Sequence, residues 1–159
     1  MHQGTAFETE RGISSVDASH GHALIVVAGL PEAELAARRH EALKALAVLG
    51  ISLDFLKLSL DGFSFVVPES RGEAVRDVLR AAGLEAELFT NRSILTVCAV
   101  NIRDESGLVA RIAQTVVQSG AAIESVGDMH SSVLIVLDTA SAEKAVAALR
   151  QLVGAGDSR

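Results

Sequence analysis

The chain has 159 residues, which is enough for one well-packed domain or two small ones. Hydrophobic residues make up 49% of it and charged residues 21%, but only 3% are aromatic, so a core must come from Leu, Val, Ile and Ala. The formal net charge is −6, and no run of Lys or Arg is longer than the pair at 38–39. This composition argues against nucleic-acid binding through a basic face with stacking aromatics.

The ends and the cysteine content point to a soluble chain. The first twelve residues lack the apolar core of a signal peptide, and no stretch approaches 18 uninterrupted apolar residues. The single cysteine, Cys98, lies in an apolar run, which predicts a buried thiol, and it cannot form a disulfide within the chain. We expect a cytoplasmic protein with no membrane partner.

The first elements in chain order are two strands and a helix. Residues 13–18 alternate apolar and polar side chains, as a strand does, and a glycine-bearing turn is expected at 20–22. Residues 23–29 form a short apolar run with β-branched side chains, which predicts a buried strand. Leucines and alanines at helical spacing predict a helix over 32–49, and Gly50 can cap its C-terminal end.

A hairpin follows. Residues 51–58 alternate again, which predicts a strand with one buried face. The Asp-Gly pair at 61–62 is typical of a tight hairpin turn, and it leads into an apolar strand at 63–67.

The next helix has a possible capping box formed by Ser70 and Glu73. Its apolar positions are spaced for one buried face, and it is expected to end at Gly83. Residues 84–89 then alternate as a further strand.

The second half of the chain has the same order of elements. We expect strands at 94–100, 121–128 and 132–138, with helices at about 106–119 and 141–152.

An internal repeat accounts for this order. At a separation of about 70 residues, "LAAR" (35–38) recurs as "LVAR" (108–111), and "EAVRDVLRAAG" (73–83) recurs as "KAVAALRQLVG" (144–154). The second copy lacks a final strand, and the strand at 13–18 has no partner in the first copy. A tandem duplication in which 13–18 completes the second copy explains both observations.

Each copy reads βαββαβ, which is the ferredoxin-like plan. We therefore expect an α+β fold of two ferredoxin-like units, each an antiparallel sheet with its helices on one face, the first unit being inserted into the second. Sheets of one layer leave edges and faces exposed, which predicts a homodimer.

The sequence offers no arrangement suited to catalysis. His20 and His22 have no Cys or third His nearby, His130 lies in a predicted hairpin, and Cys98 has no adjacent base. No nucleotide-binding fingerprint occurs. We expect no catalytic residues, no cofactor and no metal site.

The two strand-to-helix loops carry the remaining polar signal. The first contains Glu32 and Glu34, and the second contains Asp104 and Glu105. Acidic residues in a first helical turn can simply offset the helix dipole. Alternatively, free N–H groups at a helix start favour a carboxylate while nearby acidic side chains favour an ammonium group. A ligand with both charges on one carbon is an α-amino acid.

These features together resemble a known family. The tandem plan, the two loops and the segments "GISLDFLKL" (50–58) and "IESVGDMHSSVLIVLD" (123–138) resemble the paired ACT units of an aspartokinase regulatory region, most nearly of the diaminopimelate-sensitive type. The resemblance covers nearly the whole chain. It includes Gly4-Thr5 and "GISSV" (12–16), which are similar to the stretch joining the catalytic and regulatory parts in that family.

The resemblance implies a division of the chain. Residues 1–11 are linker-like, 20–91 form the first ACT unit, 12–19 with 92–153 form the second, and 154–159 are a flexible tail.

The resemblance also implies an effector site. Asp54 would receive the ammonium group of the ligand. The full set of positions that match the family's effector-binding segments is Ser52, Leu53, Asp54, Asp104, Gly107, Ala122 and Ile123. Two positions depart from the pattern: the first loop lacks a glycine at the helix start, and Ser106 stands where a proline often precedes Gly107.

The function that the resemblance implies is regulatory. The chain would bind an amino acid of the lysine, threonine or diaminopimelate class across a dimer and control an aspartokinase in lysine biosynthesis. Nothing in the sequence resembles the kinase domain, so it could be a free-standing protein, a subunit paired with a catalytic subunit, or part of a longer enzyme. The alternative is a structural dimerisation module with a degenerate ligand site, which the departures favour.

Overall fold

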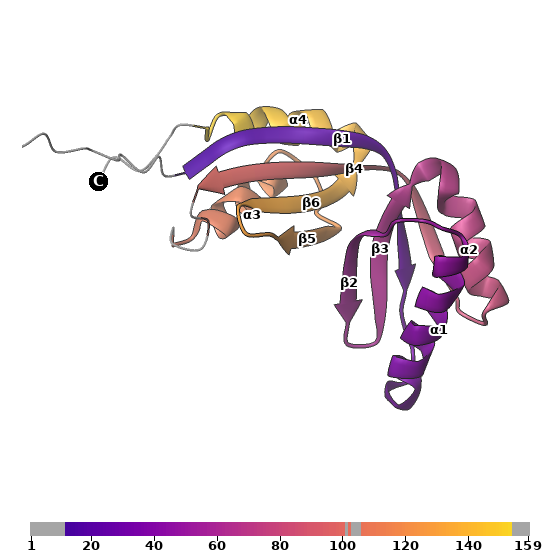
Figure 1. The fold of residues 1–159 in the computed structure, drawn as a ribbon. Helices are drawn as coiled ribbons and strands as arrows, with labels where there is room; N and C mark the ends of the chain where they lie inside the picture. Colours follow the sequence, from indigo (N-terminus) through magenta and orange to yellow (C-terminus); the bar gives the residue numbers. More distant parts are fainter. Residues whose placement is uncertain (1–11, 101, 103–105, 154–159) are drawn as a thin grey trace, which may run out of the picture. The chain divides into compact units, whose positions relative to one another are not determined.

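The computed structural model describes residues 12–100, 102 and 106–153. Within these residues it has four α-helices and a six-stranded antiparallel sheet, so the predicted α+β class with an antiparallel sheet is confirmed (Figure 1). The chain separates into two compact units. We call residues 20–93 the central unit, and residues 12–19 with the described residues from 94 onward the flanking unit. Each is considered by itself.

Two long strands belong to both units. The strand order is β2-β3-β1-β4-β6-β5, and β1 (Gly12–Val27) and β4 (Glu87–Val100) are each continuous. The turn predicted at 20–22 and the break predicted between the strands at 84–89 and 94–100 are therefore wrong. Gly21 and Asn91 have φ values of 77° and 55°, so each strand accommodates one left-handed residue without ending.

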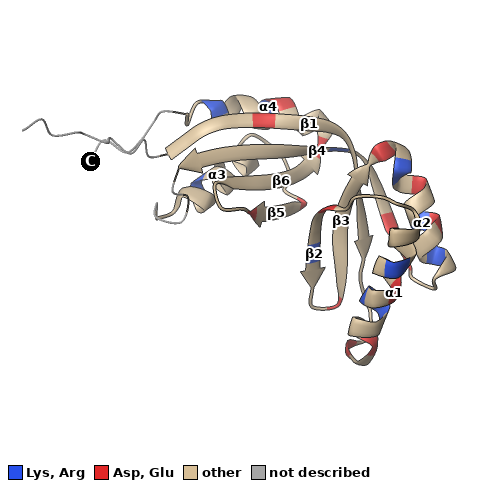
Figure 2. Ribbon diagram, viewed as in Figure 1, with Lys and Arg blue, Asp and Glu red and all other residues tan. Residues whose placement is uncertain are grey.

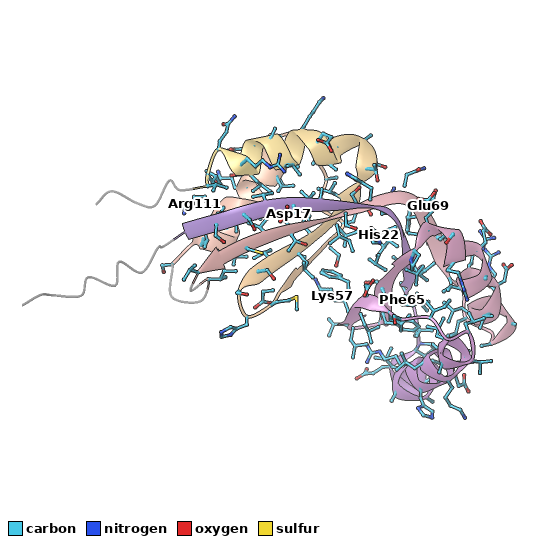
Figure 3. All side chains as sticks on the ribbon, turned by 45° about the horizontal axis from the view of Figure 1, so that its top comes forward. Asp17, His22, Lys57, Phe65, Glu69 and Arg111 are labelled. Carbon is cyan, nitrogen blue, oxygen red and sulfur yellow. The ribbon has the colours of Figure 1, made fainter. Side chains whose placement is uncertain are left out.

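The central unit places two helices on one face of its sheet (Figure 1). Its elements are the second half of β1, η1 (Glu32–Glu34), α1 (Leu35–Val48), β2 (Asp54–Ser59), β3 (Gly62–Pro68), η2 (Glu69–Arg71), α2 (Gly72–Ala81) and the first half of β4. Alternate residues of β1 and β3 meet the helices. The resulting first core contains Ala23, Ile25, Val27, Ala42, Leu46, Phe63, Phe65, Val67, Val75, Leu79, Leu84 and Ala86. Phe65, in the middle of β3, is completely buried in it (Figure 3).

The central unit has the predicted hairpin, but its two turn residues are Leu60 and Asp61, one position earlier than the predicted Asp-Gly pair, and Gly62 begins β3. Ser59 pairs with Gly62, so the loop between β2 and β3 has two residues. The burial predicted for the first strand is wrong, because β2 begins only at Asp54 and most of it is exposed. It is an edge strand with a register shift between Asp54 and Lys57, and all of its residues except Phe55 are exposed.

The capping box predicted for α2 does not form. No side chain caps this helix, whose N-cap residue is Arg71, and a short 3-10 turn precedes it. Glu73 instead makes an ion pair with Arg76 one turn later. Gly83 follows the helix with φ 76°, which is consistent with its predicted place at the C-terminal end.

The flanking unit repeats the plan with α3 (Leu108–Gln118), β5 (Ser125–Asp128), β6 (Ser132–Asp138) and α4 (Thr139–Arg150). Its second core contains Ile13, Val16, Leu95, Val97, Ala99, Ile102, Leu108, Ile112, Val116, Ala121, Val133, Ile135, Leu137, Ala142, Ala145, Val146 and Leu149. Ile13 and Val16 show that the start of β1 packs with this core. Cys98 alternates away from the core and is partly exposed, so its predicted burial is only partial.

Candidate functional site

The segment 52–54 precedes and opens the edge strand β2. Ser52 and Asp54 are exposed, whereas Leu53 is partly buried against the first core. Asp54 lies opposite Val66 of β3, and Phe55 after it has a φ of 59°. A left-handed conformation is unusual for a bulky residue. This conformation and the register shift make the strand irregular directly after the exposed Asp54.

The strand-to-helix loop of the central unit is closed by its own hairpin. The N–H of Gly29 donates to Asp61 Oδ2 (3.1 Å), and the N–H of Leu30 donates to the Asp61 carbonyl (2.8 Å). The expectation that this loop offers free N–H groups is therefore wrong for these two residues. A carboxylate of the protein already occupies the position where a ligand carboxylate could bind.

Arg39 of α1 strengthens this closure. Its guanidinium donates to the carbonyl of Gly62 from Nε (3.2 Å) and Nη2 (2.9 Å), and Nη2 also reaches the carbonyl of Ser59. Gly62 has no room for a side chain, since a Cβ would lie 1.9 Å from the Val27 carbonyl oxygen. The hairpin tip is thus fixed to both the start of α1 and the end of β1.

The acidic side chains of the loop have different surroundings. Glu34 accepts a hydrogen bond from Arg38 Nε (3.1 Å), and Glu41 accepts one from Arg38 Nη1 (3.3 Å). The hydrogen bond that Arg38 donates to Glu34 is the main cause, and the negative charge of Glu41 the next, of a pKa of Arg38 above its usual value. Glu32 has no ion pair or hydrogen bond with the described residues, so it is the unneutralised carboxylate of this loop.

The predicted parts of the central site do not meet within one chain. The loop contacts the hairpin tip at Asp61, whereas Asp54 is at the other end of β2. Ser59 is five residue steps along the strand from Asp54, which is roughly 16 Å at the usual rise per residue.

The flanking unit has an equivalent arrangement with different residues. Gly107 has a φ of 80° at the N-cap position of α3, Ala122 is exposed, and Ile123 packs against the second core. Asp104 lies outside the described residues. Ser131 stands where the central unit has Asp61, and its carbonyl accepts from the N–H of Ala99 (3.0 Å), but it supplies no carboxylate.

Sequence reasoning missed three residues of this arrangement. Glu124 is the equivalent of Asp54 in the flanking unit. Asp54 lies opposite Val66, and 70 residues later the N–H of Glu124 donates to the Val136 carbonyl (2.9 Å). The repeat could have indicated it. Asp61 and Arg39 act through contacts between residues that are distant in sequence, for which the sequence carried no signal.

His20 contacts another strand of its own unit. His20 is exposed on β1 rather than in a turn, and its Nδ1 lies 2.7 Å from Ser93 Oγ. Among the described residues, no group of three His, Cys, Asp or Glu side chains is placed to hold a metal ion. In the same part of the chain, no helix is both long and apolar enough to cross a lipid bilayer.

Solved structures share this fold over most of the chain. The ligand-free regulatory subunit of aspartate kinase from Thermus thermophilus matches with a TM-score of 0.79 at 23% identity, covering 89% of this chain and 98% of that one. The aspartokinase alpha and beta subunits match with a TM-score of 0.80 at 20% identity, covering 88% and 97%. Escherichia coli aspartokinase III, in complex with lysine and aspartate, matches with a TM-score of 0.70 at 14% identity, covering 91% of this chain but 34% of that one.

The similarity defines the architecture. This chain has the fold of the regulatory subunits of aspartate kinase, and it spans nearly the full length of two of the matched chains. Neither a protein-family model nor a curated protein matches the sequence.

Proposed function

We propose that this chain is a non-catalytic regulatory protein built from two ACT units, the first inserted into the second. In this proposal it binds an amino-acid effector of the lysine, threonine or diaminopimelate class and controls an aspartokinase-type activity in the cytoplasm. The observation that carries the proposal is the exposed Ser52–Asp54 segment, set at the start of an edge strand in this fold.

The effector site is proposed to need two copies of the chain. Asp54 and the loop at 29–34 lie at opposite ends of β2, too far apart for one amino acid to touch both. Two copies with their β2 edges antiparallel would bring Asp54 of one copy towards the loop of the other. Leu56, Leu58 and Leu60 on this edge are 45%, 59% and 97% exposed, which supports an apolar contact there.

A catalytic subunit is the proposed partner. In two of the matched structures this fold occurs together with an aspartokinase. One contains aspartokinase alpha and beta subunits, and in the other the fold covers 34% of the aspartokinase III chain. The test adds this chain to a separate catalytic subunit and measures inhibition by the effector. Effector-dependent inhibition would support a role as a separate subunit.

Calorimetric titration tests effector binding. Lysine, threonine, methionine and diaminopimelate are titrated into the unmodified chain and into Asp54→Asn, which keeps the shape but removes the charge. At least one should bind the unmodified chain, and Asp54→Asn should lower its affinity about ten- to a hundredfold, as expected for one charge-assisted hydrogen bond.

Asp128→Asn is the matched control, because Asp128 is also an exposed carboxylate on a strand. It should leave the affinity unchanged, and neither variant should alter the unfolding free energy without ligand by more than about 0.5 kcal/mol. If none of the four amino acids binds at millimolar concentration, the sensor proposal fails.

A structural dimerisation module is the second candidate. It is favoured by the Asp61 carboxylate, which occupies the Gly29 N–H that a ligand carboxylate would use. This candidate predicts a dimer whose stability does not change with any amino acid, whereas a ligand at 100 times its dissociation constant would add about 2.7 kcal/mol.

A further inference from the structure

The central unit has a cavity at the edge of its sheet opposite to β2. It has a volume of about 410 Å³ and lies between the end of β1, the start of β4 and α2. This volume is in the range of small-molecule sites. In the strand order, β3 and β1 separate β2 from β4, so the cavity lies roughly 14 Å from the strand that carries Asp54.

Charges of both signs line the cavity and do not neutralise each other. Arg80 of α2 and Glu85 and Glu87 before and on β4 all line it, and all three are exposed. None of them makes an ion pair or side-chain hydrogen bond with the described residues. Figure 2 shows both signs along α2.

Arg76 adds a second, positioned guanidinium. It lines the cavity one turn before Arg80, its side chain is 26% exposed, and it is held by an ion pair with Glu73. Its Nε is buried without a hydrogen-bond partner in the described structure, although it forms a longer ion pair of 3.7 Å with Asp77 Oδ1. A buried donor in that state favours a ligand or water that would satisfy it.

The cavity also has an apolar wall. Val26, Leu88 and Phe89 line it, and Leu88 continues into the first core. The guanidinium of Arg92 lies over the Phe89 ring at 5.6 Å from its centroid, which covers one face of the ring.

We propose that this cavity binds a free α-amino acid with an apolar side chain. Two guanidinium groups on one helix suit a carboxylate, which arginine can bind through two parallel hydrogen bonds. The carboxylates of Glu85 and Glu87 on the opposite side suit the ammonium group, and the apolar wall suits an aliphatic side chain. One small molecule that carries both charges would fit this volume and could contact both kinds of group. The proposal does not depend on effector binding at Asp54.

The test uses L-leucine and the full chain labelled with ¹⁵N. Saturable shifts are expected for the amides of 26–28 and 85–89, and Arg80→Gln should weaken this binding about ten- to a hundredfold. Lys44→Gln removes an exposed positive charge from α1 away from the cavity and should have no effect. Asp54→Asn should also have no effect on these amides, which separates this site from the proposed effector site.

Two analogues test the need for both charges. 4-Methylpentanoate lacks the ammonium group and 3-methylbutylamine lacks the carboxylate, and each should bind at least tenfold more weakly than leucine. The proposal is overturned if leucine causes no saturable shifts at these amides, if either analogue binds equally well, or if the shifts occur only at 52–54 and disappear in Asp54→Asn. The last result would leave the effector proposal intact.

Discussion

Single polar side chains determine how two equivalent helices of this protein begin. Asp138 precedes α4, and its Oδ1 accepts a hydrogen bond from the N–H of Ala140 (2.8 Å). The corresponding helix of the central unit, α2, begins after a 3-10 turn with no side-chain cap, although Ser70 and Glu73 have the spacing of a capping box. The capping-box motif is thus in the sequence of α2, which has no side-chain cap, whereas α4 has a side-chain cap from Asp138.

Asp138→Ala should lower the unfolding free energy by about 0.5–2 kcal/mol, because α4 loses its N-cap. Ser70→Ala should change it by less than about 0.5 kcal/mol, since Ser70 caps nothing. Urea denaturation of both variants measures the difference. Equal losses would mean that Ser70 does cap α2 in solution.

Gly62→Ala should destabilise the chain by about 1–3 kcal/mol, because the added Cβ would overlap the Val27 carbonyl oxygen. Ser59→Ala, directly before the turn, is the control; it removes only a long hydrogen bond of 3.4 Å to Asp61. Thermal unfolding of the two variants compares them. A Gly62→Ala protein as stable as the control would show that the hairpin can move away from β1.

At the scale of elements, helix α2 is attached to its sheet through a few fully buried side chains. Val75 and Leu79 are one turn apart, and both are completely buried in the first core. The predicted spacing of apolar residues in this helix was therefore sufficient to identify its inner face. The same pattern failed for β2, because the burial of an edge strand depends on which layers cover it and not on its own alternation.

Leu79→Ala should lower the unfolding free energy by about 2–5 kcal/mol, as for other large-to-small changes in a packed core. Leu60→Ala is the matched control, since Leu60 is 97% exposed in the hairpin turn and should cost less than about 0.5 kcal/mol. Urea denaturation with a common slope for all three proteins checks this. A small loss for Leu79→Ala would contradict the close packing of α2.

At the scale of the whole molecule, the exposed edge of β2 connects fold and function. Leu56 and Leu58 on this edge strand and Leu60 in the turn after it are large, exposed apolar residues, a combination that soluble monomers usually avoid. Pairing of two such edges would bury these residues and assemble the proposed effector site.

We therefore expect a homodimer whose sedimentation at micromolar concentration gives about twice the 16.6 kDa mass of the chain. Leu58→Lys should shift it towards monomer without loss of folded structure, because Leu58 is 59% exposed and a charged edge opposes pairing. Val48→Lys is the control, at an exposed position on α1. A monomer for the unmodified chain would refute the dimer.

Local patterns in the sequence determined most of the elements. The helices at 35–48, 108–118 and 139–150 lie within a few residues of their predicted positions, and the strand at 132–138 has its predicted bounds. These agree because hydrophobic periodicity and glycine stops act over a few residues of chain. The repeat of about 70 residues also indicated two similar units.

Only the tertiary structure decided the features that depend on residues distant in sequence. It joined the strands on both sides of Gly21 and of Asn91, since pairing with neighbouring strands maintains a strand through one irregular residue. It also filled the loop before α1 with the Asp61 carboxylate and set that loop at the opposite end of β2 from Asp54. The sequence by itself indicated the residues of the proposed amino-acid site. Their separation along the edge strand is a consequence of strand pairing, which no local pattern encodes.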